Sequence, residues 1–89
     1  MRVQMPIQFL TDLRFDKESM SVVVSANVND SRKTIFISQE TLQDHFRATN
    51  SPKDLIATFE RNKAAIGRKI LQIANSGVEG EIVVTTNLF

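Results

Sequence analysis

A period of two between Met20 and Val28 constrains the fold of this chain more than any other feature of its sequence. Apolar residues occupy every second position, at residues 20, 22, 24, 26 and 28, and three of the four intervening residues are polar. Such alternation is typical of a β-strand with one face buried. The turn-forming residues 29–31 follow, and then a β-branched and aromatic run from Lys33 to Ile37. Because the connection is short, the simplest arrangement of the two runs is an antiparallel hairpin.

Two shorter segments before the hairpin carry weaker strand signals. Residues 7–9 and residues 13–15 each alternate briefly between apolar and polar side chains, and the turn-like residues 16–19 follow. We expect one of the two segments to be a strand, and the pattern leaves open which one it is.

A short helix is predicted directly after the second strand of the hairpin. Ser38 can cap a helix that begins at Gln39. Glu40 then lies in the first turn, where the helix dipole favours a negative charge. Leu42 and Phe46 are one turn apart and are expected to form the buried stripe of this helix.

The start of a second helix is the strongest local signal in the chain. Ser51 is suited to the N-cap and Pro52 to the first helical position, and Asp54 follows three residues after the cap. The helix can run to about residue 76, where residues 75–77 supply a C-terminal cap, which gives a length of roughly 37 Å. Gly67 weakens the middle of this helix by about 1 kcal/mol relative to alanine.

The predicted second helix is amphipathic. At about 100° per residue, its core-facing stripe holds Leu55, Ile56, Phe59, Ile66, Ile70, Ile73 and Ala74. The opposite face holds Arg61, Ala65, Arg68 and Gln72. Leu71 lies off the core stripe, which leaves one apolar side chain for another contact.

A final strand is predicted from Glu81 to Thr86, and after a long helix it most simply rejoins the same sheet. The predicted fold class is therefore α+β: an N-terminal antiparallel β-meander, a short and then a long helix, and a C-terminal strand that returns to the sheet. No internal repeat, linker or low-complexity stretch divides the sequence, so residues 1–89 are expected to form a single domain.

Composition limits the classes of function. The 89 residues include no cysteine, which excludes disulfides, thiolate zinc sites and cysteine nucleophiles. Eleven basic and ten acidic residues give a net charge of +1, so the chain lacks the charge excess of a general nucleic-acid or acidic-membrane binder. Residues 1–10 do not form the continuous apolar stretch of a secretory signal, and the other apolar runs are too short to span a bilayer. We therefore expect a cytoplasmic protein without a membrane segment.

One candidate polar site centres on the only histidine, His45. A neighbouring carboxylate such as Asp44 can orient an imidazole for proton transfer. Lys63 falls inside the apolar stripe of the second helix, so its ammonium group is expected either to reach water or to pair with a carboxylate such as Asp44. If the two helices converge, Asp44, His45, Asn62 and Lys63 would form a small polar pocket. The structural alternative is a partly buried histidine bonded to backbone and a lysine whose stem packs on the sheet edge.

A second candidate surface is basic. Arg61, Arg68 and Lys69 lie on or beside the outer face of the second helix, where they could contact nucleic acid. Such charges are usually a solvated surface, and the small net charge ranks nucleic-acid binding below the other hypotheses. The phosphate-loop and dinucleotide fingerprints are absent, and a metal site would need ligands beyond a single histidine. The sequence thus predicts no cofactor, no metal and no catalytic residue.

Two motifs carry a resemblance to known sequences. The first is Ile37-Ser38-x-Glu40-x-Leu42-x-Asp44-His45-Phe46, and the second is Phe59-x-x-Asn62-Lys63-x-x-Ile66. Through them the chain resembles a family of small bacterial proteins classed only as a domain of unknown function, over most of its length from about Met20. In that family glycine commonly follows the phenylalanine and arginine commonly replaces Lys63, so Arg47 and Lys63 depart from the pattern. The resemblance implies a compact α+β fold and an uncharacterised role.

Two classes of function follow from these patterns. The first is a non-enzymatic interaction or regulatory module that binds a protein partner, as a monomer or homodimer, and the second is a small-ligand-binding or catalytic domain around His45. We favour the first, because no nucleophile with its base, metal set or phosphate loop is present, and a short chain leaves little room for a deep pocket. Leu71 and a free sheet edge that could recruit another strand give such a module a physical basis.

Overall fold

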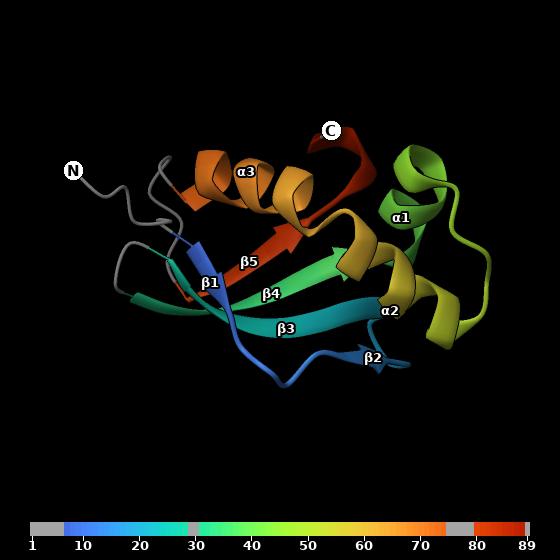
Figure 1. Ribbon diagram of the computed structural model, residues 1–89, viewed down its shortest axis with the longest axis horizontal. Helices are drawn as coiled ribbons and strands as arrows, with labels where there is room; N and C mark the ends of the chain where they lie inside the picture. The colour runs from blue at the N-terminus through green and yellow to red at the C-terminus, as the bar shows by residue number, and fades with distance from the viewer. Residues whose placement is uncertain (1–6, 29–30, 75–79, 89) are drawn as a thin grey trace.

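The computed structural model describes residues 7–28, 31–74 and 80–88. These residues form a β-sheet with the helices packed on one of its faces (Figure 1). The elements follow in the order β1 (Ile7–Phe9), β2 (Arg14–Asp16), β3 (Ser21–Val28), β4 (Ser31–Ser38), α1 (Gln39–Phe46), α2 (Pro52–Arg61), α3 (Lys63–Ala74), β5 (Glu81–Val84) and a short 3₁₀ helix, η1 (Thr86–Leu88). The expected α+β fold is confirmed, including a C-terminal strand that joins the sheet.

The central strand of the sheet is β3. It pairs antiparallel with β4 along its whole length, from Ser21 opposite Ser38 to Val28 opposite Ser31, which confirms the predicted hairpin. The other edge of β3 is shared by β1 and β2, so both N-terminal segments are strands where the sequence predicted one. β5 adds to β4 in parallel, and the sheet formed by these five described strands is mixed.

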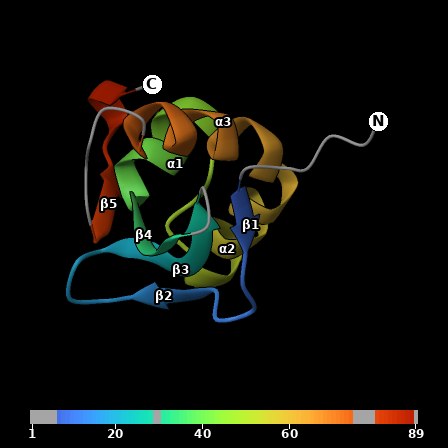
Figure 2. The same ribbon diagram turned by 90° about the vertical axis from the view of Figure 1, so that its left-hand side faces the viewer.

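The helices lie over one face of the sheet (Figure 1 and Figure 2), and buried apolar side chains form the core of the protein. This core holds residues of β1, β3, β4, β5, α1, α2 and α3. The largest fully buried side chains include Ile35, Ile37, Leu42, Leu55, Phe59, Ile66, Ile70 and Ile82. The predicted helix stripes are therefore confirmed at their centres. Their margins are less buried than expected, since four residues pack only partly on the core: Phe46, Ile56, Ile73 and Ala74.

Both predicted helix starts are confirmed, although their caps differ. The Ser38 hydroxyl oxygen accepts a hydrogen bond from the Thr41 N–H at 3.1 Å, as expected of an N-cap. Ser51 is the N-cap of α2, but its side chain makes no capping hydrogen bond. Instead, Asp54 Oδ2 accepts hydrogen bonds from the backbone N–H of Thr49 at 2.8 Å and from its hydroxyl at 3.0 Å. These bonds tie the chain that precedes α2 to its first turn.

The prediction of one long second helix is wrong, because the helix is interrupted at Asn62. There the backbone has φ −116° and ψ 20°, and the Asn62 N–H donates to the carbonyl oxygens of both Thr58 and Phe59. The second of these bonds uses the carbonyl to which the Lys63 N–H would bond in a regular helix. The Asn62 side chain also donates to the Thr58 carbonyl at 2.9 Å and holds the break in place. The cap predicted at residues 75–77 falls on residues 75–79, which lie outside the described residues.

The final strand is also shorter than predicted. β5 ends at Val84, and the chain turns into η1 where the sequence predicted a strand to Thr86. The Thr41 hydroxyl of α1 donates to the Val84 carbonyl at 3.2 Å, and α1 lies against η1. Contacts with α1 therefore replace strand pairing at the point where β5 ends.

Helix α1 ends in a left-handed turn at Arg47. This residue has φ 60° and ψ 34°, and its N–H and that of Ala48 both donate to the Leu42 carbonyl. Glycine adopts this conformation without the steric cost that a Cβ brings. The chain therefore keeps a tight turn at the position where the related motif commonly has glycine, and it places an arginine there.

We predict that Arg47→Gly stabilises the protein by about 0.5 kcal/mol. Relief of a left-handed strain of about 1–2 kcal/mol should exceed the added chain entropy of glycine, which is about 0.5–1 kcal/mol. Arg47→Ala keeps the strain and is the matched control, for which we expect no gain. Urea denaturation of the three proteins measures the difference. A glycine variant no more stable than the alanine variant would contradict the strain assigned to this turn.

Candidate functional site

Asp44 and His45 lie exposed on α1 and contact the C-terminal turn. The Thr86 hydroxyl donates to Asp44 Oδ2 at 2.8 Å. His45 Nε2 is 3.0 Å from the Thr86 carbonyl oxygen, and since a carbonyl only accepts, this nitrogen is the donor. The two side chains therefore join α1 to η1 through one residue. His45 is bonded to backbone as in the structural alternative, although it is exposed and not partly buried.

Asn62 and Lys63 lie at the junction of α2 and α3 and have other partners. Lys63 Nζ is 3.5 Å from Glu60 Oε2, so the lysine pairs with Glu60 and not with Asp44. The same nitrogen is 5.8 Å from the centroid of the Phe9 ring. Lys63 lines a surface groove, and Asp44, His45 and Asn62 are not among the residues that line it. The groove therefore does not correspond to the polar pocket of four residues that was considered from the sequence.

The three basic candidates do not share one helix. Arg61 ends α2 and donates to the Thr58 hydroxyl at 3.2 Å, whereas Arg68 and Lys69 lie on α3. Arg68 is exposed and lines a groove, and Lys69 is partly buried. The break at Asn62 divides the basic face that a continuous helix would have presented.

A groove of about 520 Å³ lies between β1 and α3, and we call it the β1–α3 groove. Its lining residues are Ile7, Gln8, Phe9, Lys63, Ala64, Gly67, Arg68 and Leu71. Among these described residues, most are apolar or glycine, two are cationic and none is acidic. The surface is therefore an apolar groove bordered by positive charge.

Gly67 lies where β1 and α3 come together in this groove. The residue is buried, and a Cβ at its position would lie 3.5 Å from Ile7 Cγ2 and 3.6 Å from Phe9 Cε2. A methyl group fits these distances, but a longer side chain would collide with β1 or displace it. Gly67, which the sequence identifies only as a residue that weakens the helix, thus forms the floor of the groove.

Phe9 is held as a fixed wall of the groove. Its ring packs edge-to-face on Phe59, with ring centroids 5.1 Å apart and an interplanar angle of 87°. Lys63 lies over the same ring and brings a positive charge to the wall. A side chain that is already ordered loses little conformational entropy when a partner covers it.

Sequence patterns identify only part of this site. They single out Lys63, Arg68 and Leu71, each for a different reason. Two small residues, Ala64 and Gly67, lie on the same helix face as Leu71 and also indicate the site. Their small side chains leave space on this face for a neighbouring element. Nothing in the local sequence identifies β1 as that neighbour.

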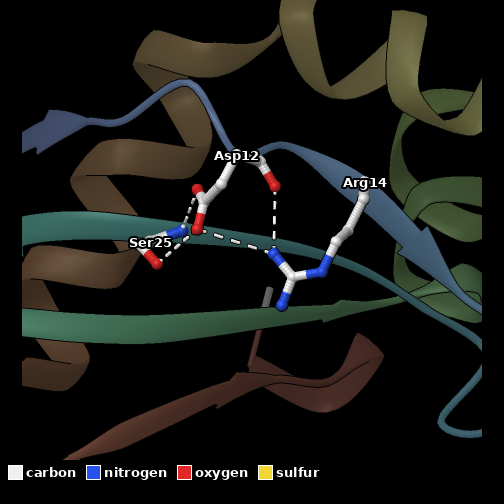
Figure 3. A network of polar contacts seen from close by, with 3 residues as sticks. All are labelled: Asp12, Arg14 and Ser25. Atoms are coloured by element: carbon white, nitrogen blue, oxygen red, sulfur yellow. Dashed lines mark hydrogen bonds and ion pairs between the residues drawn. The ribbon is translucent and has the colours of Figure 1, made fainter.

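A polar network anchors the bend between β1 and β2 (Figure 3). Neither β1 nor β2 has a residue in register with Val24 or Ser25, which leaves a gap in strand pairing along this edge of β3. Asp12 fills this gap, accepting hydrogen bonds from the Ser25 N–H at 2.8 Å and from its hydroxyl at 2.6 Å. Arg14 Nη1 lies 3.5 Å from Asp12 Oδ2 and donates to the Asp12 carbonyl at 3.0 Å. The hydrogen bonds from Ser25 lower the pKa of Asp12 below its ordinary value.

Asp12→Asn is expected to make folding less sensitive to acid. Because the folded-state pKa of Asp12 is lowered, its stabilising effect is complete above the unfolded pKa of about 3.9 and is lost as pH falls through the folded pKa. The wild-type protein should therefore lose stability between about pH 5 and pH 2, and the variant should lose less. Urea unfolding midpoints at neutral and acidic pH measure both losses.

Glu18→Gln is the matched control for this comparison, because Glu18 is an exposed carboxylate in the neighbouring turn. The control should keep the acid sensitivity of the wild type. Equal losses of stability in the wild type and in Asp12→Asn would contradict the role assigned to the Asp12 network.

The described residues contain neither a cluster of metal ligands nor a membrane-spanning helix. Across residues 7–28, 31–74 and 80–88, no three or more histidine, cysteine, aspartate or glutamate side chains gather so that they could hold a metal ion. None of the helices described there is long and apolar enough to cross a membrane.

Comparisons with known proteins give a family and a related fold. Residues 7–83 match the family described as protein of unknown function (DUF1488). The structure is similar to the crystal structure of a DUF1488 protein of unknown function from Shewanella loihica PV-4, with a TM-score of 0.75. The two chains are 18% identical, and the match covers 93% of this chain and 96% of that one. The comparison with curated proteins gives no match. The function therefore has to be argued from the residues of this chain.

Proposed function

The chain belongs to the DUF1488 family of proteins of unknown function, and we propose that it is a non-enzymatic interaction module that binds a protein partner. In this proposal the partner docks in the β1–α3 groove. The observation that carries it is the groove itself, an apolar surface of about 520 Å³ bordered by Lys63 and Arg68. This volume lies within the range of about 300–1,000 Å³ that is typical of binding pockets in proteins.

The lining residues favour binding over catalysis. Among the described residues that line the groove there is no histidine, carboxylate, serine or cysteine, so they provide neither a nucleophile activated by a base nor a pair of acids. Its polar side chains are Gln8, Lys63 and Arg68, which can donate hydrogen bonds to a partner.

The other candidate sites are weaker by the same criteria. His45 is exposed and bonds to the Thr86 carbonyl, a contact that joins two elements of the fold. The basic side chains Arg61, Arg68 and Lys69 are divided by the helix break, and the net charge of the chain is +1. Catalysis around His45 and nucleic-acid binding therefore rank below a protein partner.

A protein partner would remove apolar surface of the groove from water. Phe9 and Leu71 are both only partly buried. Full burial of a leucine-sized side chain contributes about 1.5–3 kcal/mol, so one inserted side chain would supply a useful part of the binding energy. We further propose a regulatory role, which the module would exert through the protein that it binds, and we propose the cytoplasm as its compartment.

Leu71→Gln should weaken partner capture at least about tenfold, since the loss of about 1.4 kcal/mol of apolar contact corresponds to that factor. Tagged wild-type and variant proteins are used to capture proteins from an extract of the source cells, and mass spectrometry compares the amounts retained. Val83→Gln is the matched control, because Val83 is 52% exposed and alternates with the buried residues of β5. A partner retained equally by all three proteins would place the binding site elsewhere.

Gly67→Ala tests the groove without weakening the fold. The added methyl group makes ordinary contacts with Ile7 and Phe9 and removes the helix penalty of glycine, so stability should rise by about 0.5–1 kcal/mol. The same methyl group fills part of the groove floor, so the captured partner should bind less tightly. Urea denaturation and calorimetry measure the two effects. Unchanged affinity would contradict insertion of the partner as far as the floor.

A further inference from the structure

The outer edge of β1 is open for hydrogen bonding. In an antiparallel pair, residues alternate between positions whose backbone groups face the partner strand and positions whose groups face away. The Leu10 N–H donates to the Ser25 carbonyl at 2.9 Å, so Leu10 and, two residues earlier, Gln8 face β3. The backbone groups of Ile7 and Phe9 therefore face the free edge, where no strand of the described ranges pairs with β1.

This edge adjoins the β1–α3 groove. Ile7 and Phe9 both line the groove, and β1 forms the rim of the sheet below α3 (Figure 2). A strand added beside β1 would direct every second side chain to the face that α3 covers. One extended segment can therefore pair with the backbone of β1 and fill the groove at the same time.

The charged side chains along the groove indicate which charge the bound segment should have. Lys63 and Arg68 line the groove, and the side chain of Lys63 is 42% exposed. Glu60 pairs with Lys63 at 3.5 Å, whereas Arg68 makes no ion pair with any residue of the described part of the chain. An acidic side chain on the groove face of the segment would be attracted to both cations. A second copy of β1 would instead bring two sets of these cations together.

We propose that the partner supplies an extended segment that pairs with β1 as an added strand and places an apolar and an acidic side chain, two residues apart, on the groove face. This inference rests on the proposed function and names its mode of recognition. Backbone pairing at Ile7 and Phe9 sets the register, the groove selects the apolar side chain, and Lys63 and Arg68 select the carboxylate. The match is short, because β1 has three residues and the chain bends at Asp12.

The test begins with random peptides displayed on phage, which are selected on the wild-type protein and counter-selected on Leu71→Gln. The selected peptides should share an apolar and an acidic residue two positions apart. Synthetic copies are then measured by calorimetry. Combined substitution of Lys63→Gln and Arg68→Gln should weaken binding at least about tenfold. Lys53→Gln is the matched control, because Lys53 is an exposed lysine at the start of α2, and it should leave the affinity unchanged.

Strand pairing is measured directly by amide hydrogen exchange in the complex with a selected peptide. The amides of Ile7 and Phe9 should exchange at least about tenfold more slowly, whereas that of Gln8, which already faces β3, should change little. N-methylation at every second peptide residue gives an independent readout. One of the two alternating patterns should abolish binding and the other should not, because only alternate N–H groups of the peptide face β1.

The outcomes separate this inference from the proposed function. Peptides that bind the groove without slowing exchange at Ile7 and Phe9, and that tolerate both N-methylation patterns, would exclude strand addition and keep the groove as a docking site. A second outcome is that no selected peptide binds the wild type more tightly than Leu71→Gln. If Leu71→Gln nevertheless captures less of the protein partner from the cell extract, the groove is the docking site but the partner does not bind it through a linear segment. If capture is also insensitive to Leu71→Gln, the proposed function itself fails.

Discussion

The rest of the fold depends on the pairing of β3, because all of the sheet is built outward from this strand. β1 and β2 share one of its edges and β4 takes the whole of the other. Its core-facing residues are at most 2% exposed, and they are Val22, Val24, Ala26 and Val28. A shift of β3 by one residue would turn these side chains away from the core, so the register is strongly specified. β1, and with it the groove, is therefore positioned by the most firmly held strand of the protein.

Strands and helix starts that depend on residues close together in the chain were predictable from the sequence. The position at which the long helix is interrupted was not. The hairpin and both helix starts follow from residues that are neighbours in the chain. The helix break was missed because Phe59 and Ile66 lie on the same side of a continuous helix, so the polar residues between them did not predict an interruption. The competing bonds from Asn62 to Thr58 and Phe59 become visible only in three dimensions. β1 and β2 have three residues each, which is too short for periodicity to separate a strand from a loop.

The candidate site was harder to predict because it is assembled from β1 and α3, which are far apart in the sequence. His45 was prominent in the sequence because it is the only histidine and lies beside the carboxylate of Asp44. In the structure, both side chains contact Thr86 and so connect α1 to η1. The groove instead depends on Gly67 lying against β1, and a glycine in a helix predicts only a loss of helix stability until its neighbour is known. Leu71 is a large apolar residue that periodicity already placed outside the core stripe.

An open strand edge beside an apolar groove also favours self-association, and the charges on α3 counteract it. Long, flat, apolar edges aggregate, and natural sheets commonly protect them with short strands, bends and lysine. Here β1 has three residues, the chain bends at Asp12, and Lys63 and Arg68 line the adjacent groove. Two copies paired through β1 would bring like charges together, whereas a segment that carries a carboxylate would neutralise them. Backbone pairing alone does not discriminate among partners, so the same two cations would supply both the repulsion that disfavours self-pairing and the attraction that favours an acidic partner.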